Sequence, residues 1–141
     1  MQEITTYLAP RRLDEALQAM ADGDATVFCG GTDLSPQTES GVRQYQAKLL
    51  NLRRIEGLCG IDAGANEIRI GATTTVSEIR ASAALAEIAP VLVEAAERFA
   101  SEQLRNAASI GGNICNASPA GDSLPLMLAT GSGAASRSTL G

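Results

Sequence analysis

The sequence predicts an α+β fold, and three patterns along the chain support that prediction. Residues 4–29 alternate between strand-like and helix-like runs, which is typical of a strand–helix–strand unit. Residues 60–72 hold two short apolar runs around Gly64-Ala65-Asn66, the pattern of a β-hairpin. Beyond Thr75 the apolar residues recur at helical spacing. With 141 residues, 45% of them hydrophobic, the chain is long enough to bury a core.

Each element of the N-terminal part has a local signal. Residues 4–8 indicate a strand, which Pro10 closes. The helix that follows ends at Asp22-Gly23-Asp24, and its apolar face consists of Leu13, Ala16, Leu17 and Met20. Residues 25–29 and residues 48–52 indicate two further short strands.

The C-terminal part is expected to contain helices and one ordered loop. Thr75 and Glu78 match a capping box, so a helix is expected to begin there and to run to about Ser82. Pro90 suits the first turn of the next helix. From residue 101 onward small and polar residues dominate but apolar ones remain among them, which favours an ordered loop over a linker. Residues 125–129 are expected to start a last short helix.

Composition and charge exclude several classes of function. The net charge is −5 and Lys48 is the single lysine, so no nucleic-acid-binding surface is expected. The chain has no histidine and no C-x-x-C motif, so neither a metal site nor a catalytic residue is predicted. No apolar run is long enough for a membrane span and no signal-peptide pattern is present, which predicts a cytoplasmic location. The thiols of Cys29, Cys59 and Cys115 are expected to be buried as small hydrophobic groups.

Two glycine pairs are the candidate ligand-binding features. Gly30-Gly31 follows the strand at residues 25–29, and Gly111-Gly112 follows a small and apolar approach. A Gly-Gly turn can adopt positive φ and has no Cβ, so its backbone N–H groups can close around a phosphate. Neither pair fits the Rossmann fingerprint or a P-loop, and an isolated glycine pair is most often a structural turn. Two interpretations therefore stand: a pair of structural turns, or two turns that grip the phosphates of one dinucleotide.

Two acidic residues close to these segments, Asp33 and Asp122, do not suit direct contact with phosphate. A carboxylate repels a phosphate at short range. Each is therefore expected either to accept hydrogen bonds from other groups of a ligand or to cap local backbone N–H groups.

Both glycine segments resemble the FAD-binding domain of the molybdenum hydroxylases, the family of xanthine dehydrogenase and carbon monoxide dehydrogenase. The run Cys29-Gly30-Gly31-Thr32-Asp33-Leu34 is similar to the family's Ala-Gly-Gly-Thr-Asp-like first loop. Residues 103–119, followed by Asp122 and Pro125, are similar nearly throughout to its motif Q-I-R-N-x-A-T-I-G-G-N-I-C-N-A-S-P-x-x-D-x-x-P. The Gly-Ala-Thr-Thr-Thr run at residues 71–75 also resembles the family's segment between a strand and a helix.

The resemblance implies FAD as the cofactor and assigns contacts to it. The first segment would wrap the pyrophosphate with Phe28, Cys29, Gly30, Gly31, Thr32, Asp33 and Leu34. The second segment would complete that cradle with Ser109, Ile110, Gly111, Gly112 and Asn113. The remaining implied contacts are Phe99 and Ala100 near the adenosine half, Leu104, Ala108 and Cys115 along the cofactor, and Asp122 as a hydrogen-bond acceptor. The resemblance leaves positioning of the loop to Arg105, Asn106 and Asn116.

The resemblance also implies an architecture and a function. The family's fold is the two-lobed FAD-binding domain of the PCMH (vanillyl-alcohol oxidase-like) type, with a first lobe over residues 1–56 and a partial second lobe over residues 57–141. The chain would be the flavin subunit of an oxidoreductase, with a molybdopterin-binding large subunit and a [2Fe–2S] small subunit as partners. Electrons would pass from the iron–sulfur clusters through FAD to NAD or another acceptor. The alternative is a non-catalytic module, truncated relative to the family, that serves assembly or anion binding without flavin.

Overall fold

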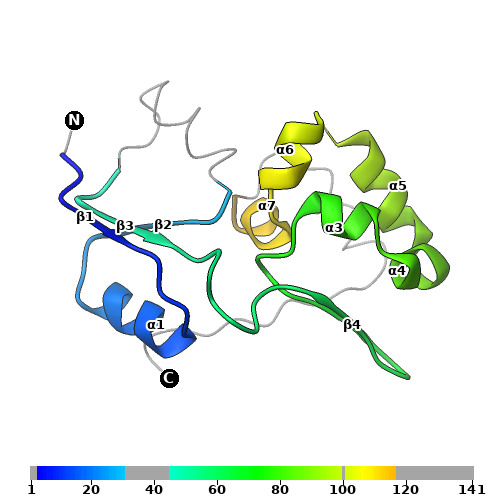
Figure 1. Ribbon diagram of the computed structural model, residues 1–141, viewed down its shortest axis with the longest axis horizontal. Helices are drawn as coiled ribbons and strands as arrows, with labels where there is room; N and C mark the ends of the chain where they lie inside the picture. The colour runs from blue at the N-terminus through cyan, green and yellow to red at the C-terminus, as the bar shows by residue number, and fades with distance from the viewer. Residues whose placement is uncertain (1–2, 31–44, 100, 117–141) are drawn as a thin grey trace. The chain divides into compact units, whose positions relative to one another are not determined.

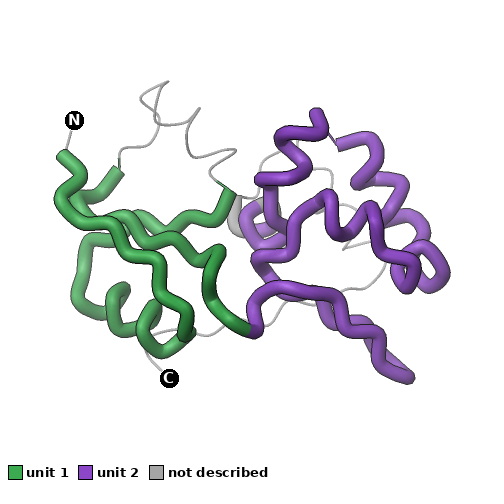
Figure 2. Tube along the Cα trace, in the orientation of Figure 1, with its two compact units in different colours: residues 1–56, 135–141 green, residues 57–134 purple. Residues whose placement is uncertain are grey.

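The computed structural model describes residues 3–30, 45–99 and 101–116. The described residues fall into two compact units, of which the first ends at Glu56 and the second begins at Gly57 (Figure 2). The units differ in their secondary structure, since the first is built on a parallel sheet and the second is mostly helical (Figure 1).

The first unit contains a three-stranded sheet of β1 (Thr6–Leu8), β2 (Ala25–Phe28) and β3 (Lys48–Asn51). β1 and β2 each pair with β3, so the strand order is β1-β3-β2. Both pairs are parallel. Helix α1 (Leu13–Ala21) connects β1 to β2 and lies on one face of the sheet (Figure 1). The predicted strand–helix–strand unit is therefore confirmed.

The single lysine of the sequence has a structural role in this unit. Lys48 Nζ donates hydrogen bonds to the carbonyl oxygens of Ala19, at 3.2 Å, and Gly23, at 3.3 Å. These two carbonyls belong to the last turn of α1 and to the turn that follows it, where φ is positive at Gly23. A cation near a helix C-terminus satisfies carbonyl groups that have no partner within the helix. Lys48 thus fastens the end of α1 to the central strand.

We expect Lys48→Met to destabilise the first unit. Methionine keeps most of the apolar stem but removes both hydrogen bonds, so the free energy of unfolding should fall by about 1 kcal/mol. Urea denaturation followed by circular dichroism measures the change. Arg54→Met is the control, because Arg54 is exposed and the substitution removes the same charge. Equal losses in the two variants would show that net charge, and not the contact with α1, sets the effect.

The second unit begins with an antiparallel hairpin of β4 (Ile61–Ala63) and β5 (Ile68–Ile70). Among the residues described after the hairpin the helices are α3 (Val76–Arg80), α4 (Ala83–Ile88), α5 (Pro90–Arg98), α6 (Glu102–Ala107) and α7 (Ile110–Asn116). Both the hairpin and the helices after Thr75 were expected. The predicted helix at residues 125–129 lies outside the described residues.

Local capping explains where the first helices of this unit start. Both bonds of the predicted capping box are present, since the Thr75 N–H donates to the Glu78 carboxylate and Thr75 Oγ1 accepts from the Glu78 N–H. Pro90 is the first residue of α5, as expected. The helix after Thr75 does not reach Ser82, however, because Ser82 caps α4 by accepting from the Leu85 N–H.

The core of the second unit is aliphatic and joins several elements. Its buried members come from α3, α4, α5, the residue that caps the end of α6, and the start of α7, namely Val76, Ile79, Leu85, Ala96, Ala108 and Ile110. The hairpin contributes Ile61, Ile68 and Ile70, which pack against this cluster. Burial of these side chains supplies most of the stabilisation of helices as short as these.

The expectation of an ordered loop from residue 101 is wrong over residues 101–116, where the chain forms α6 and α7. Ser101 caps α6 by accepting from the Leu104 N–H. Ser109 similarly precedes α7 and accepts from the Gly112 N–H. The second glycine pair is therefore the first turn of a helix and no Gly-Gly turn, because a capping serine and the contacts of α7 outweigh the low helix propensity of glycine.

One cysteine also differs from expectation. Cys59 is exposed, and its thiol donates to the Glu78 carboxylate with an Sγ–Oε1 distance of 3.5 Å. It lies between the positive-φ residues Gly57 and Gly60, in a bend that leads into the hairpin. Cys29 is half-buried, and the side chain of Cys115 lies outside the described residues.

Candidate functional site

The described part of the first glycine segment lies at the carboxyl end of a strand. Phe28 is the last residue of β2, and Cys29 and Gly30 follow it, all three half-buried. The Phe28 ring lies 6.4 Å from the ring of Tyr7, measured between centroids. In parallel sheets the segments that leave the carboxyl ends of strands are the usual place for ligands. Four further predicted contacts lie outside the described residues, namely Gly31, Thr32, Asp33 and Leu34.

The second glycine segment is held by residues 71–75, which we call the 71–75 segment. The Ile110 N–H donates to the Thr74 carbonyl oxygen at 3.0 Å, and the Gly111 N–H donates to the Ala72 carbonyl oxygen at 2.8 Å. The Gly112 N–H donates to Ser109 Oγ at 3.1 Å. All three N–H groups of the first turn of α7 therefore have partners within the chain. Three of the five amides predicted to form a cradle, those of Ile110, Gly111 and Gly112, are therefore already paired within the chain.

The two neighbouring glycines have different surroundings. A Cβ added to Gly111 would lie 2.7 Å from the Ala72 carbonyl oxygen and 2.9 Å from the Ala72 Cβ. Glycine is required there because α7 approaches the 71–75 segment closely. Gly112 is exposed, and among the described residues a Cβ added there would meet Ser109 Oγ, at 3.0 Å. Gly112 therefore leaves open the space that a side chain would fill.

Ser109 is the residue of this segment whose side chain is best placed to donate a hydrogen bond to a ligand. Its residue is only 4% exposed, and its hydroxyl oxygen accepts from Gly112 while the hydroxyl hydrogen can be donated to another group. Ala108 and Ile110, on either side of it, are buried in the core. Their side chains serve packing, so any contact that they make with a ligand must come from the backbone.

Arg105 and Asn106 connect α6 to α5 and α3 by hydrogen bonds. Arg105 Nη1 donates to the carbonyl oxygens of Glu97 and Phe99, each at 3.1 Å, at the end of α5. Asn106 Oδ1 accepts from the Ser77 hydroxyl on α3. Arg105 Nε is buried and has no hydrogen-bond partner within the described residues.

The remaining predicted contacts are dispersed. Phe99 is half-buried at the end of α5, and Leu104 is 42% exposed on α6. Asn113 and Cys115 lie on α7, and Ala100 and Asp122 lie outside the described residues. The structure thus gathers Ser109, Gly111 and Gly112 at one place in the second unit. Sequence reasoning missed Ala72 and Thr74, for which the Gly-Ala-Thr-Thr-Thr run was the available signal.

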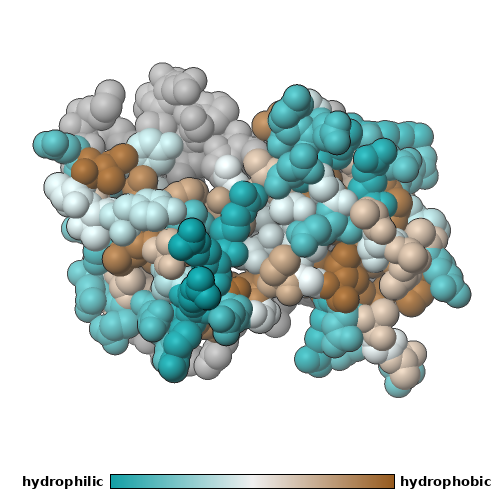
Figure 3. Space-filling view, in the orientation of Figure 1, coloured by the Kyte–Doolittle hydropathy of each residue, from teal (hydrophilic) through white to brown (hydrophobic). Residues whose placement is uncertain are grey.

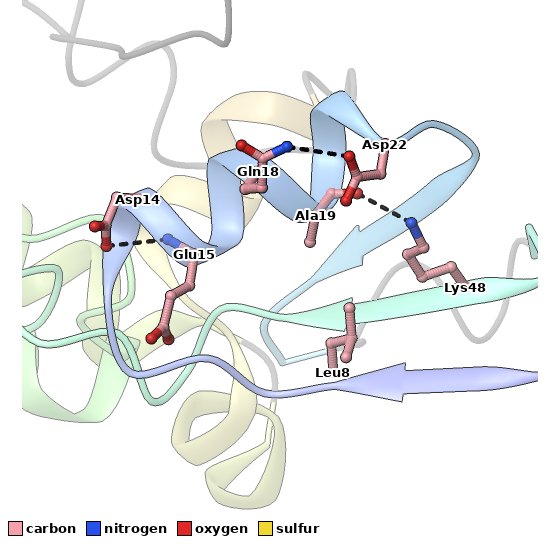
Figure 4. Close-up of a pocket in the computed structure, with 7 residues that line it drawn as sticks. All are labelled: Leu8, Asp14, Glu15, Gln18, Ala19, Asp22 and Lys48. Atoms are coloured by element: carbon pink, nitrogen blue, oxygen red, sulfur yellow. Dashed lines mark hydrogen bonds between the residues drawn. The ribbon is translucent and has the colours of Figure 1, made fainter.

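The first unit contains a pocket that is another candidate site (Figure 4). It lies beside α1 and is lined by Leu8, Asp14, Glu15, Gln18, Ala19, Asp22 and Lys48. Two of its polar contacts join lining residues to each other, since Gln18 donates to Asp22 and Lys48 donates to the Ala19 carbonyl. The hydrogen bond from Arg12 lowers the pKa of Asp14, but both side chains are exposed on the surface. The pocket therefore has the features of a solvated helix surface.

Other kinds of site find no support in the described residues. Across these residues no group of three or more His, Cys, Asp or Glu side chains is placed to hold a metal ion. No helix in the described ranges has the length and apolar character needed to cross a bilayer. Hydrophilic side chains cover much of the face seen in Figure 3, with hydrophobic ones in small patches between them.

Comparison with known proteins identifies the family. The sequence model of one protein family, described as the FAD binding domain in molybdopterin dehydrogenase, matches residues 2–140. The chain belongs to this family. The resemblance noted in the sequence, with FAD as the family's cofactor, is therefore confirmed.

Relatives of the FAD-binding family cover most of this chain. The alpha subunit of the 6-hydroxypseudooxynicotine dehydrogenase complex of Paenarthrobacter nicotinovorans is 32% identical over 124 residues, which are 86% of this chain and 41% of that protein. The xanthine dehydrogenase FAD-binding subunit of Escherichia coli O157:H7 is 31% identical over 126 residues, 87% of this chain and 42% of that protein. The chain thus spans under half the length of the curated relatives that it matches.

A solved structure shares the fold. The cyanide-inactivated form of the Cu,Mo-CO dehydrogenase superposes with a TM-score of 0.80 at 29% identity, over 87% of this chain and 43% of that chain. The α+β class predicted from the sequence agrees with this likeness and with the sheet and helices described above.

Proposed function

We propose that this chain binds FAD as the flavin-binding part of a molybdopterin-dependent dehydrogenase. The observation that carries the proposal is the family match, which extends over residues 2–140 and includes both glycine segments. One FAD molecule would be contacted by residues 28–34 and by residues 109–113. The first unit and the second unit would be the two lobes of a PCMH-type domain, the second of them partial.

The residues of the second segment fit such a ligand by a hydroxyl and an unobstructed glycine, since three of the amides expected to form a cradle are already paired. The Ser109 hydroxyl can donate to a phosphate oxygen, and Gly112 presents no side chain that would block an approaching group. The Ile110 and Gly111 amides are occupied by the 71–75 segment and serve to fix Ser109 and Gly112 in place. This segment would thus contribute to FAD binding through the Ser109 hydroxyl and through the surface that Gly112 leaves open.

A second observation favours a ligand near α6. Arg105 Nε is a buried donor without a partner in the described residues, and a buried donor of this kind normally has an acceptor. Arg105 lies beside Phe99, for which proximity to the adenosine half of FAD was predicted. An acceptor group of the cofactor would satisfy that nitrogen.

The function proposed for the whole protein is electron transfer within an oxidoreductase. Bound FAD would supply the redox chemistry, so the residues of this chain need only bind and orient it, and none is proposed as catalytic. The partners would be a molybdopterin-binding subunit and a [2Fe–2S] subunit, with NAD or another compound as the electron acceptor. The names of the relatives describe multisubunit dehydrogenases and an FAD-binding subunit, in keeping with this proposal.

Flavin binding tests the proposal directly. The purified protein should be yellow or become yellow with added FAD, and Gly112→Leu should weaken FAD binding at least roughly ten-fold by filling the open surface. Fluorescence titration with FAD measures the dissociation constant. Ala86→Leu is the control, because Ala86 is an exposed position on α4 that receives the same side chain. Failure of the wild-type protein to bind FAD, or equal binding by Gly112→Leu, would contradict the assigned contacts.

A further inference from the structure

Thr74 joins two parts of the second unit that are distant in the sequence. Its residue is fully buried, at 0% exposure, although its side chain is polar. Thr74 Oγ1 accepts from the Gly60 N–H at 2.9 Å and donates to the Gly60 carbonyl oxygen at 3.1 Å. The hydroxyl therefore uses both its donor and an acceptor site on one residue at the base of the hairpin.

The backbone of the same residue holds α7. The Thr74 carbonyl oxygen accepts from the Ile110 N–H at 3.0 Å, and the flanking Val76 N–H donates to the Ala108 carbonyl oxygen at 3.0 Å. Ser109 lies between these two bonds, in an isolated antiparallel bridge with Thr75. The hydroxyl of Thr74 fixes the 71–75 segment to the hairpin, and the carbonyl of Thr74 fixes the start of α7 to that segment.

We propose that Thr74 is a positioning residue for the ligand contacts of α7, so that its hydroxyl sets the place of Ser109 and Gly112 by holding the 71–75 segment against Gly60. The inference rests on the proposed function for the identity of the ligand. It adds a residue that touches no ligand and that acts through two hydrogen-bonded steps, from Gly60 to Thr74 and from Thr74 to α7.

Thr73 provides a matched control. It is also buried, and its Oγ1 donates to the Leu58 carbonyl oxygen at 2.8 Å. Among the described residues α7 donates to the carbonyls of Ala72 and Thr74 and not to that of Thr73. Thr73→Val and Thr74→Val remove a hydroxyl of the same type from buried neighbours, but only the second removes it from a residue whose backbone carbonyl holds α7.

The test compares Thr74→Val, Thr74→Ser and Thr73→Val in the full-length protein with two readouts. Amide hydrogen exchange reports on the Ile110 and Gly111 N–H groups, with the Gly64 N–H in the hairpin as internal reference, since it donates to Glu67. FAD titration gives the dissociation constant of each variant. Melting temperatures of the three variants show how much general stability each one loses.

We expect Thr74→Val to speed exchange at Ile110 and Gly111 relative to Gly64 and to raise the FAD dissociation constant, each roughly ten-fold, the ratio that corresponds to losing one buried hydrogen-bonding group. Thr74→Ser restores the hydroxyl and should return both readouts to near the wild-type values. Thr73→Val should leave both readouts close to wild type even if its melting temperature falls as far as that of Thr74→Val.

Two results would overturn the inference: unchanged exchange at Ile110 in Thr74→Val, or a Thr73→Val variant that matches Thr74→Val in both readouts. If wild-type protein does not bind FAD, the proposed function fails, while the exchange comparison still decides whether Thr74 holds α7.

Discussion

Gly111→Ala should destabilise the second unit, whereas Gly112→Ala should leave its stability nearly unchanged. A Cβ at residue 111 would meet the backbone carbonyl and the Cβ of Ala72, neither of which can rotate away. Helix α7 would have to move off the 71–75 segment, and the hydrogen bonds of the Ile110 and Gly111 amides would lengthen. Overpacking of this kind costs about 1–3 kcal/mol, and the weakening of these bonds should place Gly111→Ala at the upper end of that range.

Gly112→Ala is the matched control for that prediction. Within the described part of the chain a Cβ at residue 112 would meet Ser109 Oγ alone, a side-chain atom that can rotate, and alanine gains about 0.5–1 kcal/mol over glycine inside a helix. The two effects should nearly cancel. Urea denaturation of the two variants beside wild type measures the difference, and an equal loss of stability in both would show that α7 does not pack against Ala72 as described.

Leu85→Ala should produce the other large effect. Leu85 is 1% exposed and belongs to the core cluster that also contains Ile110 of α7. Removal of a buried leucine side chain lowers the free energy of unfolding by about 2–5 kcal/mol, because the transfer free energy is lost and a cavity remains. The melting temperature of the second unit should fall accordingly. FAD binding should weaken as well, since α7 packs on the same core.

Ile88→Ala on the same helix is the control for Leu85→Ala. Ile88 is 60% exposed, so its truncation should change stability by no more than about 0.5 kcal/mol. Thermal unfolding followed by circular dichroism compares the two variants. Similar shifts in melting temperature would mean that α4 does not bury the face that carries Leu85.

The elements that could be predicted are those whose signals are local. The capping box of Thr75 and Glu78 lies within four consecutive residues, and Pro90 marks the first turn of α5 by its own geometry. The serine caps of α4, α6 and α7 lack such a signal, because the residue three positions after each is Leu85, Leu104 or Gly112 in place of Glu or Gln. A serine without its partner is hard to distinguish from a serine in a turn.

The candidate site could be predicted only in part, for a related reason. The glycine pairs identified which segments matter, but a glycine that admits a ligand and a glycine that admits another part of the chain look the same in the sequence. Gly111 is the second kind, and its requirement comes from Ala72, which lies far away along the chain. The role of Thr74 depends likewise on Gly60 and Ile110, so no local pattern could reveal it.

The strand order of the first unit has a consequence for synthesis on the ribosome. β1 and β2 each pair with β3, which is the last of the three to emerge, so neither of the earlier strands finds its neighbour until Lys48–Asn51 has left the exit tunnel. Parallel pairing over such separations is slow because loop closure must precede any gain from contacts. The nascent N-terminal region should therefore stay open to proteases and chaperones until β3 arrives and closes the sheet in one step.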